Sequence, residues 1–133
     1  AKLAAELLNG KDYETLNLTD YTIRAYGQNL LGDGLDTVIN AMKQADTFVI
    51  GSPLYWHNIC GSVRNMLDRF YGKIKKGELF GRKLYFVFQG AAPEQWMLEA
   101  GEYTMKRFAA HYGLSYGGMM TNRDEAAKLT KTV

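Results

Sequence analysis

Apolar residues follow two kinds of spacing along this chain, and together they predict alternating strands and helices. Residues 83–88 (KLYFVF) are almost continuously apolar, as is typical of a strand buried on both faces of a sheet. A shorter apolar run, residues 48–50, is expected to end at Gly51-Ser52-Pro53. We expect two further short strands, in the alternating residues 13–18 (YETLNL) and in residues 114–121 (LSYGGMMT), where two glycines weaken the pattern.

Between these runs, apolar residues lie three and four positions apart, which is the spacing of an amphipathic helix. Asp33 is an expected N-cap, Pro93 suits a first helical turn, and Gly113 is an expected helix end. The expected helices are residues 1–8, 35–45, 63–70, 93–112 and 124–133. Strict alternation of helix and strand predicts an α/β fold, with one domain over residues 1–133 and a parallel sheet covered on both faces.

The alternation begins with a helix, although a chain of this class normally begins with a strand. In a doubly wound sheet of order 2-1-3-4-5 the first strand lies in the centre. Losing it would cost more than the ~5–15 kcal/mol of a typical domain's net stability. We therefore expect the domain to be N-terminally incomplete: the chain is a fragment, or the strand and its phosphate-binding loop are absent from the sequence, or another chain supplies the strand.

Composition narrows the class of protein. The 133 residues are 47% apolar and 23% charged, which are values of a globular domain. A scattered net charge of +2 argues against nucleic acid as a partner, and no apolar run is long enough to span a bilayer or to resemble a signal peptide. The single cysteine, Cys60, excludes an internal disulfide and a CxxC metal site, so we expect a reducing, cytoplasmic setting.

One stretch resembles a known family. Residues 45–56 (ADTFVIGSPLYW), followed by Gly61, Arg64-Asn65 and Leu67-Asp68-Arg69, are similar to the FMN-binding segment of the flavodoxin-like NAD(P)H-dependent FMN reductases. The resemblance implies a flavodoxin-like three-layer αβα fold with sheet order 2-1-3-4-5, non-covalent FMN and a homodimer. It also implies an enzyme that passes a hydride from NAD(P)H through flavin N5 to a small acceptor such as a quinone, azo or nitro compound.

The chain departs from this family and from its relatives in two places. The S-P-R-x-x-x-N-T-type phosphate loop of the family would precede Ala1 and is absent. The related iron–sulfur flavoproteins carry a cysteine cluster in the connection before the second helix. Residues 23–31 contain no cysteine, so we expect no iron–sulfur cluster.

The predicted FMN site begins where residues 48–50 end, because α/β proteins bind ligands beyond the carboxyl ends of their strands. Pro53 fixes the direction of the chain, and Tyr55 or Trp56 can pack against a flat ring. In the alternative interpretation these aromatic residues cover the end of the sheet or form a subunit interface. The residues of this segment that we predict to contact FMN are Ser52, Pro53, Leu54, Tyr55, Trp56, Asn58, Ile59 and Gly61.

A second predicted part of the site follows the next strand. Gln89, Gly90 and Ala91 can bind the flavin's N1–C2 carbonyl end or a substrate, although ordinary turn chemistry explains them equally well. Asn58 has both donor and acceptor groups for the pyrimidine edge. His57 is a candidate proton donor to the acceptor, or else a solvated loop residue. We expect neither a protein nucleophile nor a metal, because the flavin carries the chemistry.

The remaining notable residues have simpler interpretations. Cys60 is expected to be a small apolar filler, and Asp68 and Arg69 to be structural. The lysines at 73, 75 and 76 belong to a solvated connector or attract the phosphates of NAD(P)H. Trp96, Tyr103 and Met105 are expected in the core or in an interface. Dimers of the family that this chain resembles often build part of the flavin pocket from the partner, which makes Tyr26, His57 and Trp96 candidates to act across an interface.

Two other functions stay open at this point. A flavodoxin-type electron carrier is the first, although such carriers are usually strongly acidic and this chain is not. A non-catalytic apo protein that lacks the phosphate loop is the second. A receiver domain is disfavoured, because Asp46 precedes its strand and the last strand ends at Met119-Met120-Thr121, without a lysine.

Overall fold

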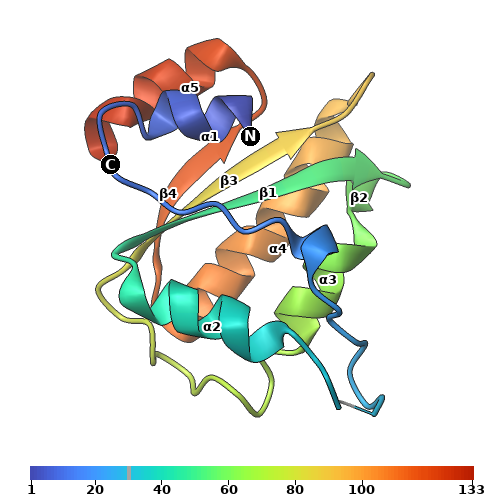
Figure 1. Ribbon diagram of the computed structural model, residues 1–133. Helices are drawn as coiled ribbons and strands as arrows, with labels where there is room; N and C mark the ends of the chain where they lie inside the picture. Colours follow the sequence, from blue (N-terminus) through green and yellow to red (C-terminus); the bar gives the residue numbers. More distant parts are fainter. Residues whose placement is uncertain (30) are drawn as a thin grey trace.

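A parallel sheet forms the middle of three layers (Figure 1). The computed structural model describes residues 1–29 and 31–133. Strands β1 (Thr47–Tyr55), β3 (Lys83–Gln89) and β4 (Ser115–Met120) are parallel, and β2 (Asn58–Ile59) pairs antiparallel with the end of β1. The sheet order is β2-β1-β3-β4. The prediction that β1, β3 and β4 are neighbours and run parallel is therefore confirmed.

Helices cover both faces of the sheet, as alternation predicts. On one face, α1 (Lys2–Leu7) packs against α5 (Arg123–Leu129), which a short 3-10 turn, η2 (Thr130–Thr132), extends. On the other face, α2 (Leu35–Gln44), α3 (Gly61–Asp68) and α4 (Gln95–Tyr112) enclose the larger core (Figure 1). The odd and even residues of β3 therefore enter different cores, with Tyr85 in the first and Phe86 in the second.

The helix ends agree closely with the sequence signals. Gly113 ends α4 in the left-handed region, with φ of 81°, where a glycine carries no steric penalty. The N-cap of α2 is Gly34 and not Asp33, which lies one residue earlier; Asp33 Oδ1 still accepts a hydrogen bond of 2.9 Å from the backbone N–H of Leu35, the first residue of the helix. Pro93 lies two residues before the first residue of α4 and not within its first turn.

The strand predicted at residues 13–18 is wrong. Within the described residues, this segment forms no strand and ends in a 3-10 turn, η1 (Leu18–Asp20), which Asn17 caps through a side-chain hydrogen bond from Thr19 N–H. The alternating pattern is still used, because Leu16 and Leu18 pack against the larger core. What is missing is a neighbouring strand, without which an extended segment has no backbone ladder. The following connection, residues 19–32, includes residue 30, which lies outside the described residues.

The predicted end of the strand that begins near residue 48 is also wrong. Strand β1 does not end at Gly51-Ser52-Pro53 but continues to Tyr55, and the chain then turns back into β2. Leu54 pairs with Ile59 and Tyr55 with Asn58, so the connection is a tight hairpin. The two-residue turn, Trp56-His57, lacks the Asn-Gly or Asp-Gly sequence that usually signals such a hairpin.

The glycines of β4 allow close packing and do not simply weaken the strand. A Cβ on Gly117 would lie 2.3 Å from the ring of Tyr85, and the register between β3 and β4 shifts at this point. Of the three residues of α4 expected in the core or in an interface, Met105 is in the core. Trp96 and Tyr103 are 51% and 67% exposed, so for these two only the interface interpretation is left.

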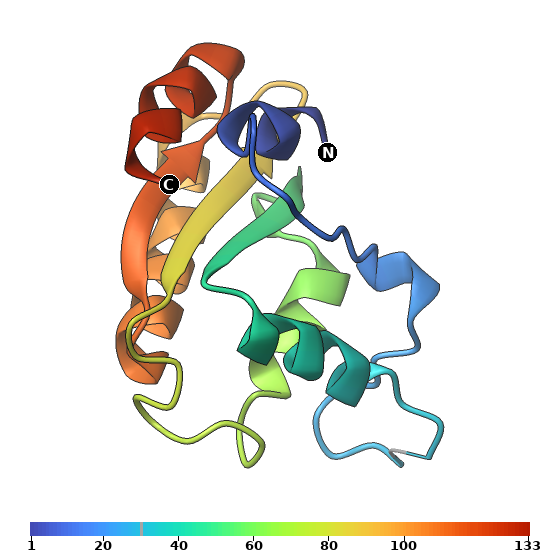
Figure 2. The same ribbon diagram turned by 60° about the vertical axis from the view of Figure 1, so that its left-hand side comes forward.

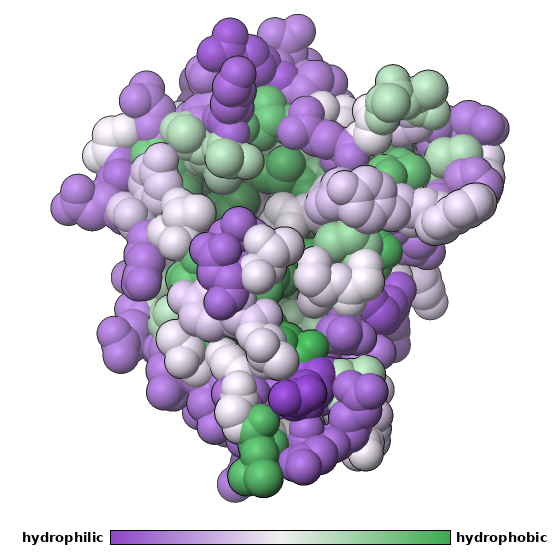
Figure 3. Space-filling model, turned by 45° about the vertical axis from the view of Figure 1, so that its right-hand side comes forward, coloured by the Kyte–Doolittle hydropathy of each residue, from purple (hydrophilic) through white to green (hydrophobic). Residues whose placement is uncertain are grey.

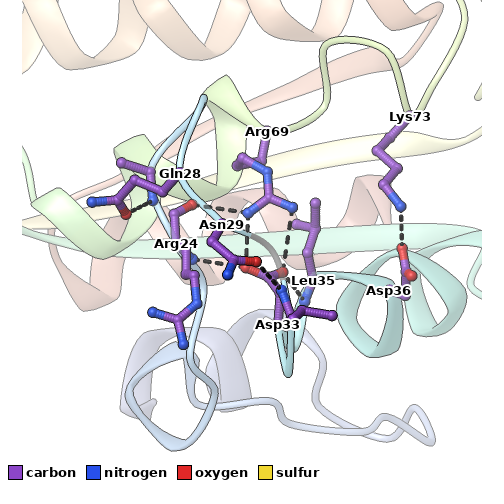
Figure 4. Close-up of polar contacts among 10 residues, drawn as sticks. Arg24, Gln28, Asn29, Asp33, Leu35, Asp36, Arg69 and Lys73 are labelled. Carbon is purple, nitrogen blue, oxygen red and sulfur yellow. Dashed lines mark hydrogen bonds and ion pairs between the residues drawn. The ribbon is translucent and has the colours of Figure 1, made fainter.

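A buried ion pair ties the connection before α2 to the end of α3 (Figure 4). Arg69 is only 4% exposed, and its Nη1 donates to Asp33 Oδ2 at 2.8 Å and to the carbonyl oxygen of Arg24 at 2.9 Å. Burial by itself raises the pKa of Asp33, but hydrogen bonds from Arg69 and from the backbone N–H groups of Arg24 and Leu35 lower it to about 2. The predicted structural role of Arg69 is confirmed.

The connector after α3 is mostly exposed to solvent. Residues 71–82 form turns without a helix or strand, as expected, although Ile74 and Leu79 are buried. Lys73 contacts Asp36 at 2.9 Å, and both side chains are largely exposed (Figure 4). A pair of this kind contributes little to stability.

Candidate functional site

The two predicted parts of the site lie side by side at the carboxyl end of the sheet. Ser52 pairs with Phe88 and Pro53 with Gln89, so the segments that follow β1 and β3 start next to each other. A Cβ on Gly90 would lie 3.0 Å from Cβ of Leu54, which shows how closely the two chain segments approach. The side chain of Gln89 reaches away from β1 toward the end of β4, where its Nε2 donates to the carbonyl oxygen of Thr121 at 3.3 Å.

The hairpin turn holds two non-glycine residues in the left-handed region. The φ angles are 47° at Trp56 and 66° at His57, and each costs energy for a residue with a Cβ. Trp56 is 94% exposed, and Tyr55 and His57 are exposed beside it. Such backbone strain concentrates at functional sites, and this turn presents aromatic groups to solvent at the end of the sheet.

Replacing the turn with Asn-Gly, in the double variant Trp56→Asn and His57→Gly, is expected to raise the free energy of unfolding by about 1 kcal/mol. Glycine and asparagine adopt positive φ at lower cost, and this gain exceeds the loss of the exposed aromatic contacts. Urea unfolding followed by circular dichroism measures the change. The matched control, Trp56→Ala with His57→Ala, removes the same rings without relieving the backbone. Equal stability of the two double variants would show that the turn is not strained.

Helix α4 contributes Trp96 to this edge of the sheet, whereas the sequence predicted this residue in the core or in an interface. The rings of His57 and Trp96 are 5.3 Å apart, edge to face, and Trp96 Nε1 donates to Glu94 Oε2 at 2.9 Å. A signal was present in the sequence, because Trp96 follows soon after the Gln89–Ala91 turn and therefore starts a helix at the carboxyl end of the sheet. The site consequently has an aromatic wall from two elements.

Side-chain hydrogen bonds fix the base of the hairpin. Ser52 is buried, and its Oγ accepts from the N–H of Cys60 at 2.9 Å and donates to the carbonyl oxygen of Pro53 at 2.7 Å. Burial raises the pKa of the Cys60 thiol, but hydrogen bonding with Ser52 and Ser62 brings this pKa below its usual value of 9.0. Cys60 is buried in the larger core, which confirms its expected role as an apolar filler.

The other predicted contact residues differ in what they offer. Asn58 Oδ1 accepts from the N–H of Ile59 at 2.8 Å, which leaves its amide NH₂ as a donor. The side chain of Ile59 is buried, so only its backbone is available to a ligand. Gly61 begins α3, has no positive φ, and a Cβ there would meet nothing within 4 Å. Packing within the chain therefore does not explain this glycine.

These features fit a flat, extended ligand better than a metal. Gly61, Gly90 and exposed Ala91 leave backbone accessible at the edge of the sheet, and exposed aromatic rings stand beside it. Within residues 1–29 and 31–133, no group of three His, Cys, Asp or Glu side chains is arranged to hold a metal ion. In the same residues, no helix is long and apolar enough to cross a membrane.

A family model matches almost the whole chain. The model for NADPH-dependent FMN reductases covers residues 1–124. The chain belongs to this family. As a member, it carries the predicted FMN-binding segment within the matched range, and the resemblance noted in residues 45–69 is confirmed at the level of the family.

Individual relatives agree with this assignment. An iron–sulfur flavoprotein of Archaeoglobus fulgidus is 35% identical over 65 residues, which are 49% of this chain and 32% of that protein. An FMN-dependent NADH:quinone oxidoreductase of Erythrobacter litoralis is 29% identical over 109 residues, 74% of this chain and 55% of that protein. The chain thus spans about a third to just over half of the length of these two relatives.

The solved structures confirm the fold. A flavodoxin, a WrbA-like protein from Agrobacterium tumefaciens, matches with a TM-score of 0.62 at 13% identity, over 98% of this chain and 85% of that one. At this identity the match shows the fold alone. The flavodoxin-like α/β architecture is therefore confirmed, with the sheet differing from the expected order by the short β2 and the unformed strand at residues 13–18.

The iron–sulfur relative does not change the expectation for this member of the family. Its name describes that protein, whereas residues 23–31 here contain no cysteine and Cys60 is the single cysteine of the sequence. Clusters of this kind are held by thiolates. The absence of a cluster stays a prediction.

Proposed function

We propose that this chain forms the ring-binding part of an FMN-dependent oxidoreductase, which transfers hydride from NAD(P)H to a small acceptor such as a quinone, azo or nitro compound. Family membership supports the proposal. The observation that carries it is the approach of the β1 and β3 ends, with Pro53 beside Gln89 and Gly90 against Leu54, under a strained aromatic turn. When bound, FMN supplies the hydride-transfer chemistry itself.

The residues of the chain then bind, orient and shield. Backbone groups of Leu54 and Gly90 line the place where the two segments meet, and the Asn58 amide offers a donor beside them. Tyr55 and Trp56 supply aromatic surface for stacking and for excluding water. His57, held against Trp96, can hold a proton on its imidazole for the acceptor. The Ser52 hydroxyl, already engaged by Cys60 and Pro53, positions the hairpin and is not free to bind.

The homodimer is also part of the proposal. Tyr55, Trp56, Trp96 and Tyr103 are all exposed, and Trp96 and Tyr103 are seven residues apart in α4, so they lie on one face of the helix. Exposed aromatic residues of this kind are enriched in interfaces. The reducing, cytoplasmic location is likewise proposed, in keeping with a free, buried Cys60.

Two measurements test the function. FMN binding is followed by the change in flavin fluorescence during a titration, and turnover is followed by the oxidation of NADH and NADPH in the presence of quinones and azo dyes. We expect saturable binding and acceptor-dependent oxidation. Binding of FMN without turnover on any acceptor would favour the electron-carrier alternative. Absence of binding would favour the apo alternative.

Gly61→Ala is expected to weaken FMN binding about tenfold, because a Cβ would occupy space that only a ligand needs. The free energy of unfolding should stay unchanged or rise by up to about 1 kcal/mol, since alanine is the better helix former. Fluorescence titration and urea unfolding measure the two quantities. A variant that loses stability and binding together would place the requirement for glycine in the fold and not in the ligand site.

A further inference from the structure

Two pairs of neighbouring residues in this sequence share one kind of chemical reactivity. Asn9 is followed by Gly10, and Asp33 is followed by Gly34. In each pair the backbone nitrogen of the glycine can attack the side-chain carbonyl carbon of the residue before it, because glycine has no side chain that obstructs the approach. Neither pair is among the residues proposed to contact FMN. The folded chain places the two pairs in very different surroundings.

Burial and hydrogen bonds hold the Asp33-Gly34 pair in place. The side chain of Asp33 is buried, and its carboxylate accepts hydrogen bonds from Arg69 and from the backbone N–H of Leu35. The N–H of Gly34 donates to the carbonyl oxygen of Thr22 at 2.9 Å. An ionised carboxylate is a poor electrophile, and a nitrogen whose N–H is bonded elsewhere cannot turn toward it. The structure therefore protects this pair.

The Asn9-Gly10 pair has none of these restraints. Helix α1 ends at Leu7, and both residues of the pair are exposed in the turn that follows. Gly10 has a φ of 78°, and a Cβ on it would meet nothing within 4 Å. Among the residues that the structure describes, none accepts a hydrogen bond from the Gly10 N–H or bonds to the side-chain amide of Asn9. Both reacting groups are therefore accessible and can move.

We propose that Asn9 is a site of spontaneous deamidation. The nitrogen of Gly10 forms a bond to Cγ of Asn9, and the side-chain NH₂ leaves as ammonia with the proton of the Gly10 N–H. This closes a five-membered succinimide ring. Water then adds its OH to either carbonyl carbon and its proton to the ring nitrogen, which gives aspartate or isoaspartate. No electrons are gained or lost, and asparagine is a recognised thermolabile residue.

The new carboxylate would change a charged part of the surface. Helices α1 and α5 lie side by side above the sheet (Figures 1 and 2), and the surface at the top of the molecule is mainly hydrophilic (Figure 3). Asn9 borders a shallow hollow there together with Lys2, Glu6 and Arg123. Glu6 already lies 3.8 Å from Arg123, so the product carboxylate competes for the same guanidinium. It also follows the C-terminus of α1, where a negative charge is unfavourable.

Peptide mapping by mass spectrometry, with chromatographic separation of isomers, tests the proposal on the 133-residue chain stored warm at neutral pH. The same chain in guanidinium chloride is the reference, because unfolding exposes both pairs. We expect folding to slow the deamidation of Asn9 by no more than about threefold. The corresponding reaction of Asp33, loss of water and conversion to isoaspartate, should be slowed by about 100-fold. Ion exchange should also show the net charge falling by one from +2.

A pair of glycine variants tests the role of the attacking nitrogen. Gly10→Ala is expected to slow the deamidation of Asn9 by at least about tenfold, because its Cβ obstructs the approach. The matched control is Gly27→Ala. Gly27 is also exposed, has a φ of 85°, and has nothing within 4 Å of a Cβ, so the control introduces the same backbone strain elsewhere. It should leave the rate at Asn9 unchanged.

Two results would overturn the proposal. If folding slows the reaction of Asn9 as much as that of Asp33, the turn after α1 protects its asparagine. If Gly10→Ala deamidates as fast as the unaltered chain, the nitrogen of Gly10 is not the attacking group. These measurements use neither FMN nor NAD(P)H, so their failure is separate from failure of the proposed oxidoreductase function.

Discussion

Replacing Arg69 with Met is expected to lower the free energy of unfolding by about 3–5 kcal/mol. The guanidinium is 4% exposed and pairs with Asp33, whose side chain is also buried, so the variant leaves a carboxylate without its partner. It also leaves the carbonyl oxygen of Arg24 without a donor. Urea unfolding near neutral pH measures the loss. The matched control is Lys73→Met, which breaks the exposed pair with Asp36 and should cost no more than about 1 kcal/mol.

The pH dependence of stability identifies the pair as the cause. The folded pKa of Asp33 is about 2 and its usual value is 3.8, so its contribution is complete above 3.8 and is lost as the pH falls through 2. This part of the acid destabilisation, about 2 kcal/mol, should be largely absent from Arg69→Met. If that variant fails to fold, adding Asp33→Asn removes the unpaired charge and should restore part of the stability. A loss below about 1 kcal/mol for Arg69→Met would contradict a buried ion pair.

Gly101→Ala is expected to destabilise the domain by about 1–3 kcal/mol. Exchanging glycine for alanine inside a helix normally stabilises it by roughly 0.5–1 kcal/mol, so the sign is reversed here. The reason is packing: a Cβ on Gly101 would lie 2.3 Å from the ring of Phe88, which is fully buried and stacked on Phe86. Thermal and urea unfolding both report the change.

Two comparisons separate this clash from an effect on the helix. Gly61→Ala places the same methyl group on α3 in open space and should not destabilise the domain. Phe88→Leu shortens the side chain opposite Gly101, so Gly101→Ala should cost at least about 1 kcal/mol less in that background. The same cost in both backgrounds would mean that the ring is not the obstacle.

Features that depend on residues close together in the chain could be predicted from the sequence. The buried run at residues 83–88 became β3, and the helix expected at residues 93–112 became α4 with its end at Gly113. Hydrophobic periodicity and capping are local signals, which is why these elements agree. The resemblance in residues 45–69 also identified the family. The position of residues 89–91 directly after a strand placed them beside that segment at the carboxyl edge of the sheet.

Pairing between distant segments was decided by the tertiary structure. Residues 13–18 have the pattern of a strand but no neighbour to bond with, and residues 54–59 form a hairpin despite lacking a typical turn sequence. The ion pair of Asp33 with Arg69 joins residues that are 36 positions apart. A strand needs backbone hydrogen bonds to a neighbouring strand, and a buried charge needs a counterion. Both partners are distant in the sequence, so neither feature can be identified from adjacent residues.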